Sequence, residues 1–277
     1  MKHIIEINNL TKSYGKHRGV SNISFCVQEG DIFGFLGQNG AGKSTTIRSM
    51  LGFIHYQEGE IKIFDKDAKA NHEEILKDIG YMPSEAQFYP SMTVKEVIKM
   101  AADVRGMDCS EEAEKLCSRL QLDTGKKIKE LSLGNKKKVS IVCAMQHKPK
   151  LFIFDEPTSG LDPLMQAEFF QLIEEYVAKG ATCMLSTHVL SEVRDHCNRV
   201  AIMKEGKLLC TDTVENLTKV NAKHVKVSIG EETQEYVYKG DMGAFIKELA
   251  GKDVKDLLVE EPSIEEIFMH YYENEEE

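Results

Sequence analysis

The string GQNGAGKS at residues 37–44 constrains the fold more than any other feature of the chain. It matches the pattern G-x-x-x-x-G-K-[ST] at every fixed position. The nearly continuous apolar run 31–36 before it is typical of a strand buried on both faces. After it, Ile47, Met50 and Leu51 recur at helical spacing. The sequence therefore predicts a strand, a glycine-rich loop and a helix in direct succession.

The residue types of this loop suit the binding of phosphate. Glycines let successive backbone N–H groups turn toward phosphate oxygens with no Cβ in the way. The Lys43 ammonium can reach the β- and γ-phosphates, and the Ser44 hydroxyl can ligate Mg²⁺. The following helix points its positive end at the anion. A glycine-rich turn without a ligand is the alternative, but the strand before the loop and the helix after it favour phosphate binding.

Two acidic residues, Asp155 and Glu156, follow the apolar run 151–154. An acid at the end of such a strand can hold Mg²⁺, directly or through water. A neighbouring acid can orient and deprotonate an attacking water. The alternative is an acidic loop after a core strand. The phosphate loop favours a Walker B pair, with Asp155 on the metal and Glu156 as the base.

Lys43 and Asp155 lie 112 residues apart, which is far more than a compact GTPase needs. The guanine-reading string Asn-Lys-x-Asp of GTPases is also missing from the sequence. Much of the interval, from about Ser91 to Lys148, has helical periodicity. We therefore expect an α-helical subdomain over about residues 84–150, inserted between the two phosphate-site motifs.

Two helix starts can be predicted within this interval. Thr93, followed by Glu96 three residues later, predicts a capping box at the first. Ser110 is expected to cap a second helix that runs through Leu116 and Leu120.

The rest of residues 1–214 alternates strand and helix patterns, which is typical of the α/β class. We expect a mixed sheet with flanking helices, the core of a P-loop nucleoside triphosphatase. The expected elements are strands at 4–7, 23–27 and 181–185, a helix at 165–178 and a hairpin at 200–210.

Residues 215–277 have a different pattern and are expected to form a small α+β accessory domain. Valines and tyrosines alternate in its strands, and an amphipathic run ends it. The expected elements are strands near Val225 and Val227, near Tyr236 and Tyr238 and at 254–260, a helix at 242–249, and a helix that starts at Pro262 with Ile264, Ile267 and Phe268 on one face.

Charge and cysteine content exclude several classes of protein. The 277 residues carry a net charge of −10, and residues 215–277, with 7 basic and 16 acidic residues, account for −9 of it. Because nucleic-acid binding needs a basic footprint, we expect no nucleic-acid partner. Seven scattered cysteines without a C-x-x-C pair favour a reducing cytosol, with neither a disulfide framework nor a zinc site. No apolar run reaches the roughly 18 residues of a membrane span.

Over about residues 3–213, the order of the motifs resembles that of the ATP-binding cassette (ABC) family. Tyr14 lies upstream of the phosphate loop, where the family stacks an aromatic ring on adenine. The string LSLGN at 131–135 is similar to the signature L-S-G-G-Q. The string SGLD at 159–162 resembles the family's D-loop, and His188 its switch histidine. Alone, Tyr14 and His188 would be ordinary turn and strand-end residues, but their order favours the resemblance.

The resemblance implies a head-to-tail dimer that closes over two ATP molecules. Ser132 and Gly134 would then cap the γ-phosphate held by the partner, since a helix N-terminus favours anions. Asp162 would lie at the dimer seam, and His188 would hold Glu156 and the attacking water in line. The implied catalytic residues are Glu156, His188 and Lys43, and the implied ATP contacts are Tyr14, Gln38, Asn39, Gly40, Ala41, Gly42, Lys43, Ser44, Thr45, Ser132, Gly134 and Asp162.

Three residues depart from the family's pattern. Leu133 replaces a signature glycine and Asn135 replaces its glutamine. Ser132 and Gly134 keep the anion site, with weaker contact to the γ-phosphate. Ser84 stands where a glutamine, or a glutamate in some exporters, usually follows a proline. Its shorter hydroxyl would reach Mg²⁺ or the attacking water through a bridging water, which weakens coupling to the transporter.

We expect the ATPase subunit of an ABC transporter, with ATP and Mg²⁺ as cofactors. Its expected partners are a second ATPase subunit and an integral-membrane permease, which would hold it in the cytoplasm at the inner face of the membrane. The string PSIEEIF at 262–268 is similar to one near the ends of exporter subunits, which favours export. Two alternatives stay open: a soluble ABC ATPase that moves no solute, and a nucleotide-binding module with weak turnover.

Overall fold

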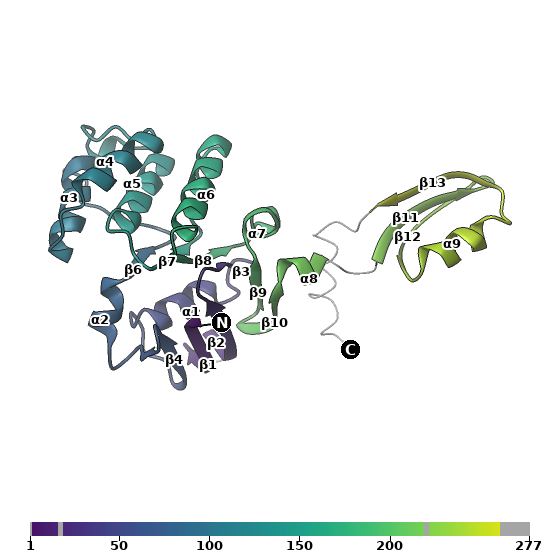
Figure 1. Cartoon of the computed structure of the whole chain (residues 1–277), viewed down its shortest axis with the longest axis horizontal. Helices are drawn as coiled ribbons and strands as arrows, with labels where there is room; N and C mark the ends of the chain where they lie inside the picture. Colours follow the sequence, from purple (N-terminus) through teal and green to yellow (C-terminus); the bar gives the residue numbers. More distant parts are fainter. Residues whose placement is uncertain (1, 16–18, 219–221, 261–277) are drawn as a thin grey trace. The chain divides into compact units, whose positions relative to one another are not determined.

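The computed structural model describes residues 2–15, 19–218 and 222–260 (Figure 1). The chain divides into two compact units, residues 1–211 and 212–277, a division slightly earlier than the expected one after residue 214. Among the helices in the described residues, none has the length and apolarity needed to cross a membrane.

An antiparallel sheet in the first unit is built from four strands: β1 (His3–Ser13), β2 (Gly19–Gln28), β4 (Glu58–Ile63) and β5 (Lys66–Asp67). Their order is β2-β1-β4-β5. Ile23, Phe25 and Val27 are buried, as their alternation along β2 predicts. The strands expected at 4–7 and 23–27 are therefore confirmed.

A second sheet has six strands: β3 (Ile32–Gly37), β6 (Ile79–Met82), β7 (Leu151–Asp155), β8 (Thr182–Thr187), β9 (Arg199–Lys204) and β10 (Lys207–Thr213). Their order is β10-β9-β3-β8-β7-β6, and β9, β3, β8, β7 and β6 run parallel. The register pairs Leu36 with Thr187 and Asp155 with Ser186. Because parallel strands share one carboxyl edge, the phosphate loop, the acidic pair and His188 are brought to that edge.

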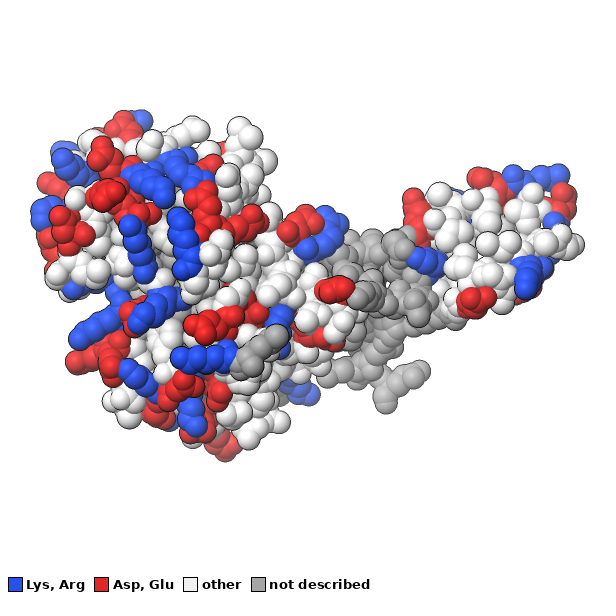
Figure 2. Space-filling view, viewed as in Figure 1, with Lys and Arg blue, Asp and Glu red and all other residues white. Residues whose placement is uncertain are grey.

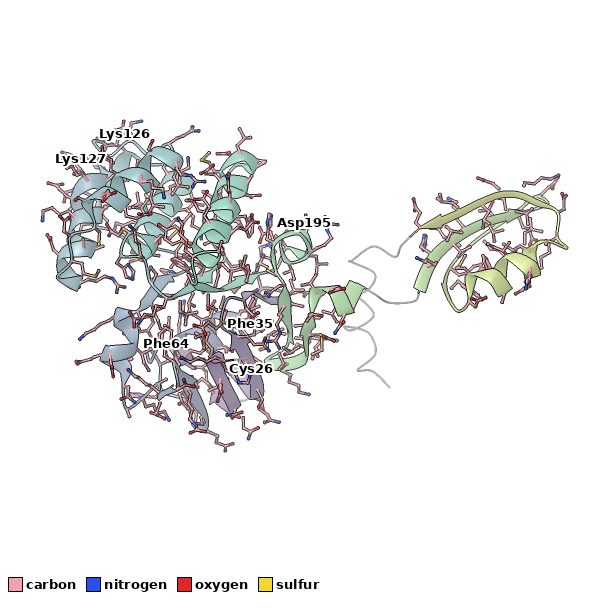
Figure 3. All side chains as sticks on the ribbon, viewed as in Figure 1. Cys26, Phe35, Phe64, Lys126, Lys127 and Asp195 are labelled. Carbon is pink, nitrogen blue, oxygen red and sulfur yellow. The ribbon has the colours of Figure 1, made fainter. Side chains whose placement is uncertain are left out.

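The main core of the first unit lies around helix α1 (Lys43–Met50), which packs against strands of both sheets. Ile47 and Met50 are buried there together with Phe33 and Phe35. Figure 3 shows Phe35 inside this part of the molecule. The helix therefore starts at the phosphate loop and is fixed by apolar burial on both sides, and the α/β class is confirmed.

Helices α3 (Val94–Arg105), α4 (Ser110–Arg119) and α5 (Leu133–Met145), with the 3₁₀ turn η1 (Ile128–Glu130), gather in a helical lobe between β6 and β7 in the chain (Figure 1). Lys126 and Lys127 mark the outer edge of this lobe (Figure 3). The fold is thus an α/β core with an inserted helical subdomain.

One of the two predicted helix caps is confirmed and the other is wrong. The Thr93 hydroxyl accepts the Glu96 N–H and the Glu96 carboxylate accepts the Thr93 N–H, so the capping box forms. Ser110, however, is the first residue of α4, and Cys109 takes the cap position without a side-chain hydrogen bond. The Asp108 carboxylate accepts the Ser110 N–H at 3.0 Å, so Asp108 satisfies a backbone donor at the start of this helix.

The remaining helices of the first unit are α2 (His72–Lys77), α6 (Pro163–Val177) and α7 (Leu190–His196). The Asp162 carboxylate caps α6 by accepting the Met165 N–H at 3.0 Å, and Pro163 occupies the first turn. The helix expected at 165–178 and the hairpin at 200–210, formed by β9 and β10, are confirmed.

The second unit contains helix α8 (Val214–Thr218), strands β11 (Ala222–Ile229), β12 (Glu232–Lys239) and β13 (Val254–Glu260), and helix α9 (Met242–Leu249). The antiparallel strand order is β12-β11-β13. Val225 and Val227 are buried with Phe245 and Leu249 of α9. The helix expected from Pro262 lies outside the described residues.

Acidic and basic side chains are interspersed over the surface of the first unit (Figure 2). Residues 1–214 carry a net charge of only −1. A nucleotide is therefore not drawn by a broad positive field, and its phosphates must be bound by local groups such as Lys43 and backbone N–H groups.

His147, just after α5, is a buried histidine that the fold keeps neutral. Its Nε2 atom lies 3.1 Å from the Ile79 carbonyl oxygen, and only 7% of the residue is exposed. Burial, aided by the charge of Arg105, lowers the pKa of His147 from 6.5 to about 4. Between pH 6.5 and about 4, the unfolded chain binds a proton on His147 that the folded chain does not bind. The free energy of unfolding therefore decreases as the pH falls through this range.

His147→Gln is expected to make the free energy of unfolding less sensitive to acid. The variant keeps an N–H donor for Ile79 but has no group that titrates between the folded and unfolded pKa values. Urea unfolding at neutral pH and at about pH 5 measures the change, since the wild-type protein should lose more stability than the variant over that range. Equal losses in the two proteins would contradict the neutral, buried state of His147.

Candidate functional site

The phosphate loop between β3 and α1 has the backbone shape that its glycines predict. Gly40 and Gly42 have φ angles of +87° and +103°, a region that favours glycine. A Cβ on Gly42 would lie 2.5 Å from Val20, whereas a Cβ on Gly40 would meet nothing within 4 Å. The loop is closed by a bond of 3.1 Å from the Ala41 N–H to the Gln38 carbonyl.

Lys43 points its ammonium group back into this loop. The residue is only 5% exposed, and Nζ donates to the Gly37 carbonyl at 2.5 Å and to the Gln38 carbonyl at 3.3 Å. The same Nζ lies 3.1 Å from Oε1 of Glu156. The cation predicted to bind phosphate and the acid predicted to activate water thus form an ion pair.

Asp155, at the end of β7, is fully buried. Its Oδ1 accepts a hydrogen bond of 2.5 Å from the Ser186 hydroxyl on β8. Its Oδ2 is buried and has no hydrogen-bond partner in the part of the chain that the structure describes. Because an unpaired buried carboxylate oxygen is costly, this atom suits a bound cation. Among the described residues, no group of three or more His, Cys, Asp or Glu side chains is arranged to hold a metal ion.

Glu156 adopts a left-handed backbone conformation, with φ of 51°, which is uncommon outside glycine. Its N–H is held by the Ser186 hydroxyl at 3.1 Å and lies 3.2 Å from the Ser186 carbonyl. Its Oε2 lies 2.8 Å from Nδ1 of His188. The strained backbone therefore places the carboxylate between Lys43 and His188, where it can orient a water molecule.

A cavity of about 550 Å³ opens at the phosphate loop. It is lined by most of the predicted ATP contacts and by two residues that were not predicted, Gly19 and Arg48. Arg48 lies four residues after Ser44 on α1, so helical spacing could have found it. Half-exposed Tyr14 also lines the cavity. The lining residues are Tyr14, Gly19, Gln38, Asn39, Gly40, Gly42, Lys43, Ser44, Thr45, Arg48, Ser84 and Glu156.

Four predicted ATP contacts do not line this cavity, and one of them, Ala41, is buried in the phosphate loop. The Ser132 hydroxyl caps α5 by accepting the Asn135 N–H at 3.3 Å, and Asp162 caps α6. Gly134 lies against the D-loop, where a Cβ would come within 2.6 Å of the Gly160 carbonyl oxygen. Leu133, beside them, is 70% exposed. These signature and D-loop residues thus form a second surface of the cassette, apart from its own phosphate cavity.

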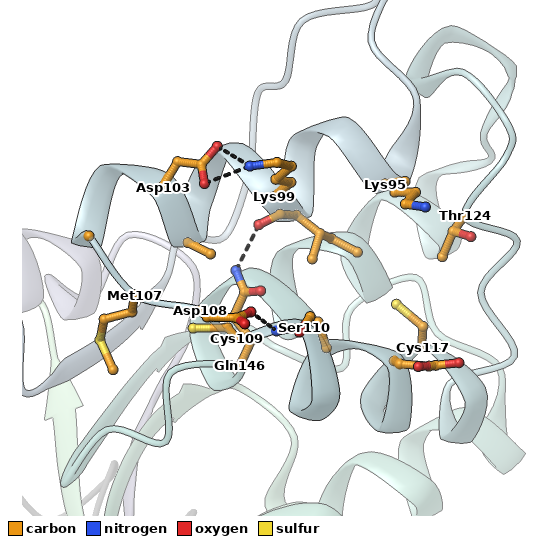
Figure 4. Close-up of a pocket in the computed structure, with 15 residues that line it drawn as sticks. Lys95, Lys99, Asp103, Met107, Asp108, Cys109, Ser110, Cys117, Thr124 and Gln146 are labelled. Carbon is orange, nitrogen blue, oxygen red and sulfur yellow. Dashed lines mark hydrogen bonds and ion pairs between the residues drawn. The ribbon is translucent and has the colours of Figure 1, made fainter.

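A larger cavity of about 710 Å³ lies between α3 and α4 (Figure 4). Lys99 and Asp103 form an ion pair of 2.8 Å along it, and the Gln146 amide donates to the Ile98 carbonyl at 3.0 Å. It is lined by none of the phosphate-site motifs. Size alone therefore does not identify the chemical site, and the smaller cavity at the phosphate loop has the reactive groups.

The fold and this site define a P-loop ATPase with an inserted helical subdomain. The family model described as ABC transporter matches residues 20–159, just over half of the chain. The chain belongs to the ABC transporter family, and it is an ATP-binding subunit that hydrolyses ATP.

Curated relatives agree with this assignment. Bacitracin transport ATP-binding protein BcrA of Bacillus licheniformis is 37% identical over 240 residues, which cover 86% of this chain and 78% of the relative. An uncharacterized ABC transporter ATP-binding protein of Methanocaldococcus jannaschii is 34% identical over 274 residues, 94% of this chain and all of the relative. The probable multidrug protein YbhF of Escherichia coli is 34% identical, and the chain spans 38% of its length.

Solved structures show the same fold. An ATP-binding subunit of an ABC transporter superposes with a TM-score of 0.72 and 30% identity, covering 78% of this chain and 92% of that chain. The ADP conformation of another ATP-binding cassette gives a TM-score of 0.66 and 26% identity, over 78% and 95% of the two chains.

Gly42→Ala is expected to weaken ATP binding by about tenfold or more, because its methyl group must displace Val20 as well as strain the loop. Gly40→Ala is the matched control, since its backbone is strained by about 1–2 kcal/mol but its methyl group meets open space. Titration calorimetry with ATP measures both. Equal affinities for the two variants would show that close packing at Gly42 does not shape the loop.

Proposed function

We propose that this ATPase subunit powers export through a separate integral-membrane permease, working as one half of a head-to-tail dimer at the cytoplasmic face of the membrane. The observation that supports it best is the group formed by Lys43 and Glu156, which line the cavity, and His188, which contacts Glu156. The carboxylate lies 3.1 Å from the ammonium and 2.8 Å from the imidazole. This arrangement suits hydrolysis rather than nucleotide binding alone.

We assign the roles from this geometry. Lys43 and the loop N–H groups would bind the phosphates, and Tyr14 would stack on adenine. The Ser44 hydroxyl and the free oxygen of Asp155 would hold Mg²⁺, whose charge neutralises the triphosphate. Glu156 would deprotonate the attacking water, with His188 holding its carboxylate in place.

The position of the signature residues supports a dimer. Ser132 and Gly134 lie at the start of α5, where the helix dipole favours an anion, but they do not line the phosphate cavity of their own chain. A second copy placed head to tail would bring its phosphates to this helix end. Asp162, which follows the D-loop glycine, would then lie at the seam between the copies.

The names of two relatives support a role in transport. One relative is named for bacitracin transport and another for multidrug transport. A permease partner would also explain an ATPase subunit whose described helices include no membrane span. We propose that residues 215–277 form a separate accessory domain.

Glu156→Gln is expected to release phosphate about 100-fold more slowly or worse, because the amide cannot act as a base, while ATP binding is retained. Glu73→Gln, at an exposed carboxylate on α2, is the control and should match the wild-type rate. Wild-type turnover in Glu156→Gln would contradict the base assignment.

The same variant tests the dimer, because blocked hydrolysis should trap the closed form. In analytical ultracentrifugation, Glu156→Gln is expected to sediment as a dimer with ATP and as a monomer without it. A monomer under both conditions would contradict the head-to-tail assembly. Fractionation of cells with and without the permease gene then tests membrane recruitment, which should require the permease.

A further inference from the structure

Lys137 is a buried cation that the nucleotide-site motifs leave unexplained. It lies in the second turn of α5, five residues after the signature serine, and is only 6% exposed. Its Nζ donates a hydrogen bond of 2.8 Å to the main-chain carbonyl of Ser84. Burial of an ammonium is costly, so this residue is expected to lower the stability of the fold unless its charge is compensated.

The acceptor of this bond belongs to the phosphate cavity. Ser84 follows β6 by two residues, at the point where the chain leaves the sheet for the helical subdomain, and it lines the cavity with Lys43 and Glu156. The bond from Lys137 therefore joins the cavity wall to the helix that carries Ser132 at its start.

The charge of Lys137 also interacts with the carboxylates near the phosphate cavity. Burial lowers the pKa of Lys137, and the carboxylates of Asp155, Glu156 and Glu85 oppose that change. The ammonium thus lies in the electrostatic field of the Walker B pair. A neutral side chain of the same length would keep the packing but lose this interaction.

Helix α5 is also fixed to the sheet beside this contact. A Cβ on Gly80 of β6 would lie 2.2 Å from the Ala144 carbonyl oxygen of α5, so helix and strand backbones pack directly on each other. The Lys137–Ser84 bond extends this contact to the loop that follows β6.

We propose that Lys137 is a positioning residue for ATP hydrolysis, which ties the loop at Ser84 to the signature helix. The proposal rests on the ATPase activity and does not depend on the direction of transport. The connection between the loop at Ser84 and helix α5 does not involve the short Ser84 side chain. It is made by the Ser84 main-chain carbonyl, which accepts the hydrogen bond from Lys137. The cavity wall and the anion-binding end of α5 would then move together.

Lys137→Met tests the proposal, because it removes the ammonium and keeps a similar length. It is expected to lower kcat for phosphate release about tenfold, with KM for ATP within about twofold, since the loop is misplaced after ATP has bound. Lys137→Arg keeps the charge and the hydrogen-bond donor, so its kcat should be at least about half of the wild-type value. Lys136→Met, at the partly exposed neighbour, is the matched control with wild-type kinetics expected.

Three results would overturn the proposal: wild-type kcat in Lys137→Met, equal losses in the Met and Arg variants, or a change confined to KM. If Lys137→Met does not fold, Lys137→Gln takes its place with the same expectations. Phosphate release is measured on the full chain without any transported solute. The measurement therefore tests the role of Lys137 even if the protein does not power export.

Discussion

The ion pair between the Lys43 ammonium and the Glu156 carboxylate, at 3.1 Å, joins the two halves of the site. Both groups lie in largely buried positions, where either charge alone would be costly. The pair can form only because β3 and β7 end at the same edge of the parallel sheet, with β8 between them. Strand order therefore brings the two charges together. The carbonyls of Gly37 and Gln38 hold the ammonium in its place.

Two further sets of hydrogen bonds hold the residues around this ion pair. Ser186 on β8 binds both Asp155 and the Glu156 N–H, which fixes the acidic pair against the sheet. Lys137 on α5 binds the loop at Ser84 and so connects the same region to the helical subdomain. The Arg105 guanidinium and the His147 ring add polar contacts to the Ile79 carbonyl at the start of β6, so the helical lobe is bound to the sheet at several points.

Local patterns predicted much of this structure. The loop at 37–44, the strand that ends at Asp155 and the capping box at Thr93 follow from short-range rules, and the structure contains each of these elements. Strands β4 and β5 were not predicted, because β4 pairs with β1 far away in the chain and β5 has only two residues, which pair with β4. Contacts between distant segments, such as Lys137 with Ser84, leave no periodic signal, so the sequence alone could not show them.

We propose that one chain holds the phosphate loop and the base while a second chain supplies the signature helix. The most direct measurement is the rate of phosphate release per chain as a function of protein concentration. A site completed by the partner predicts a rate per chain that rises with concentration and then levels off as dimers form. A rate per chain that is constant from the lowest measurable concentration, with the protein monomeric throughout, would contradict this account.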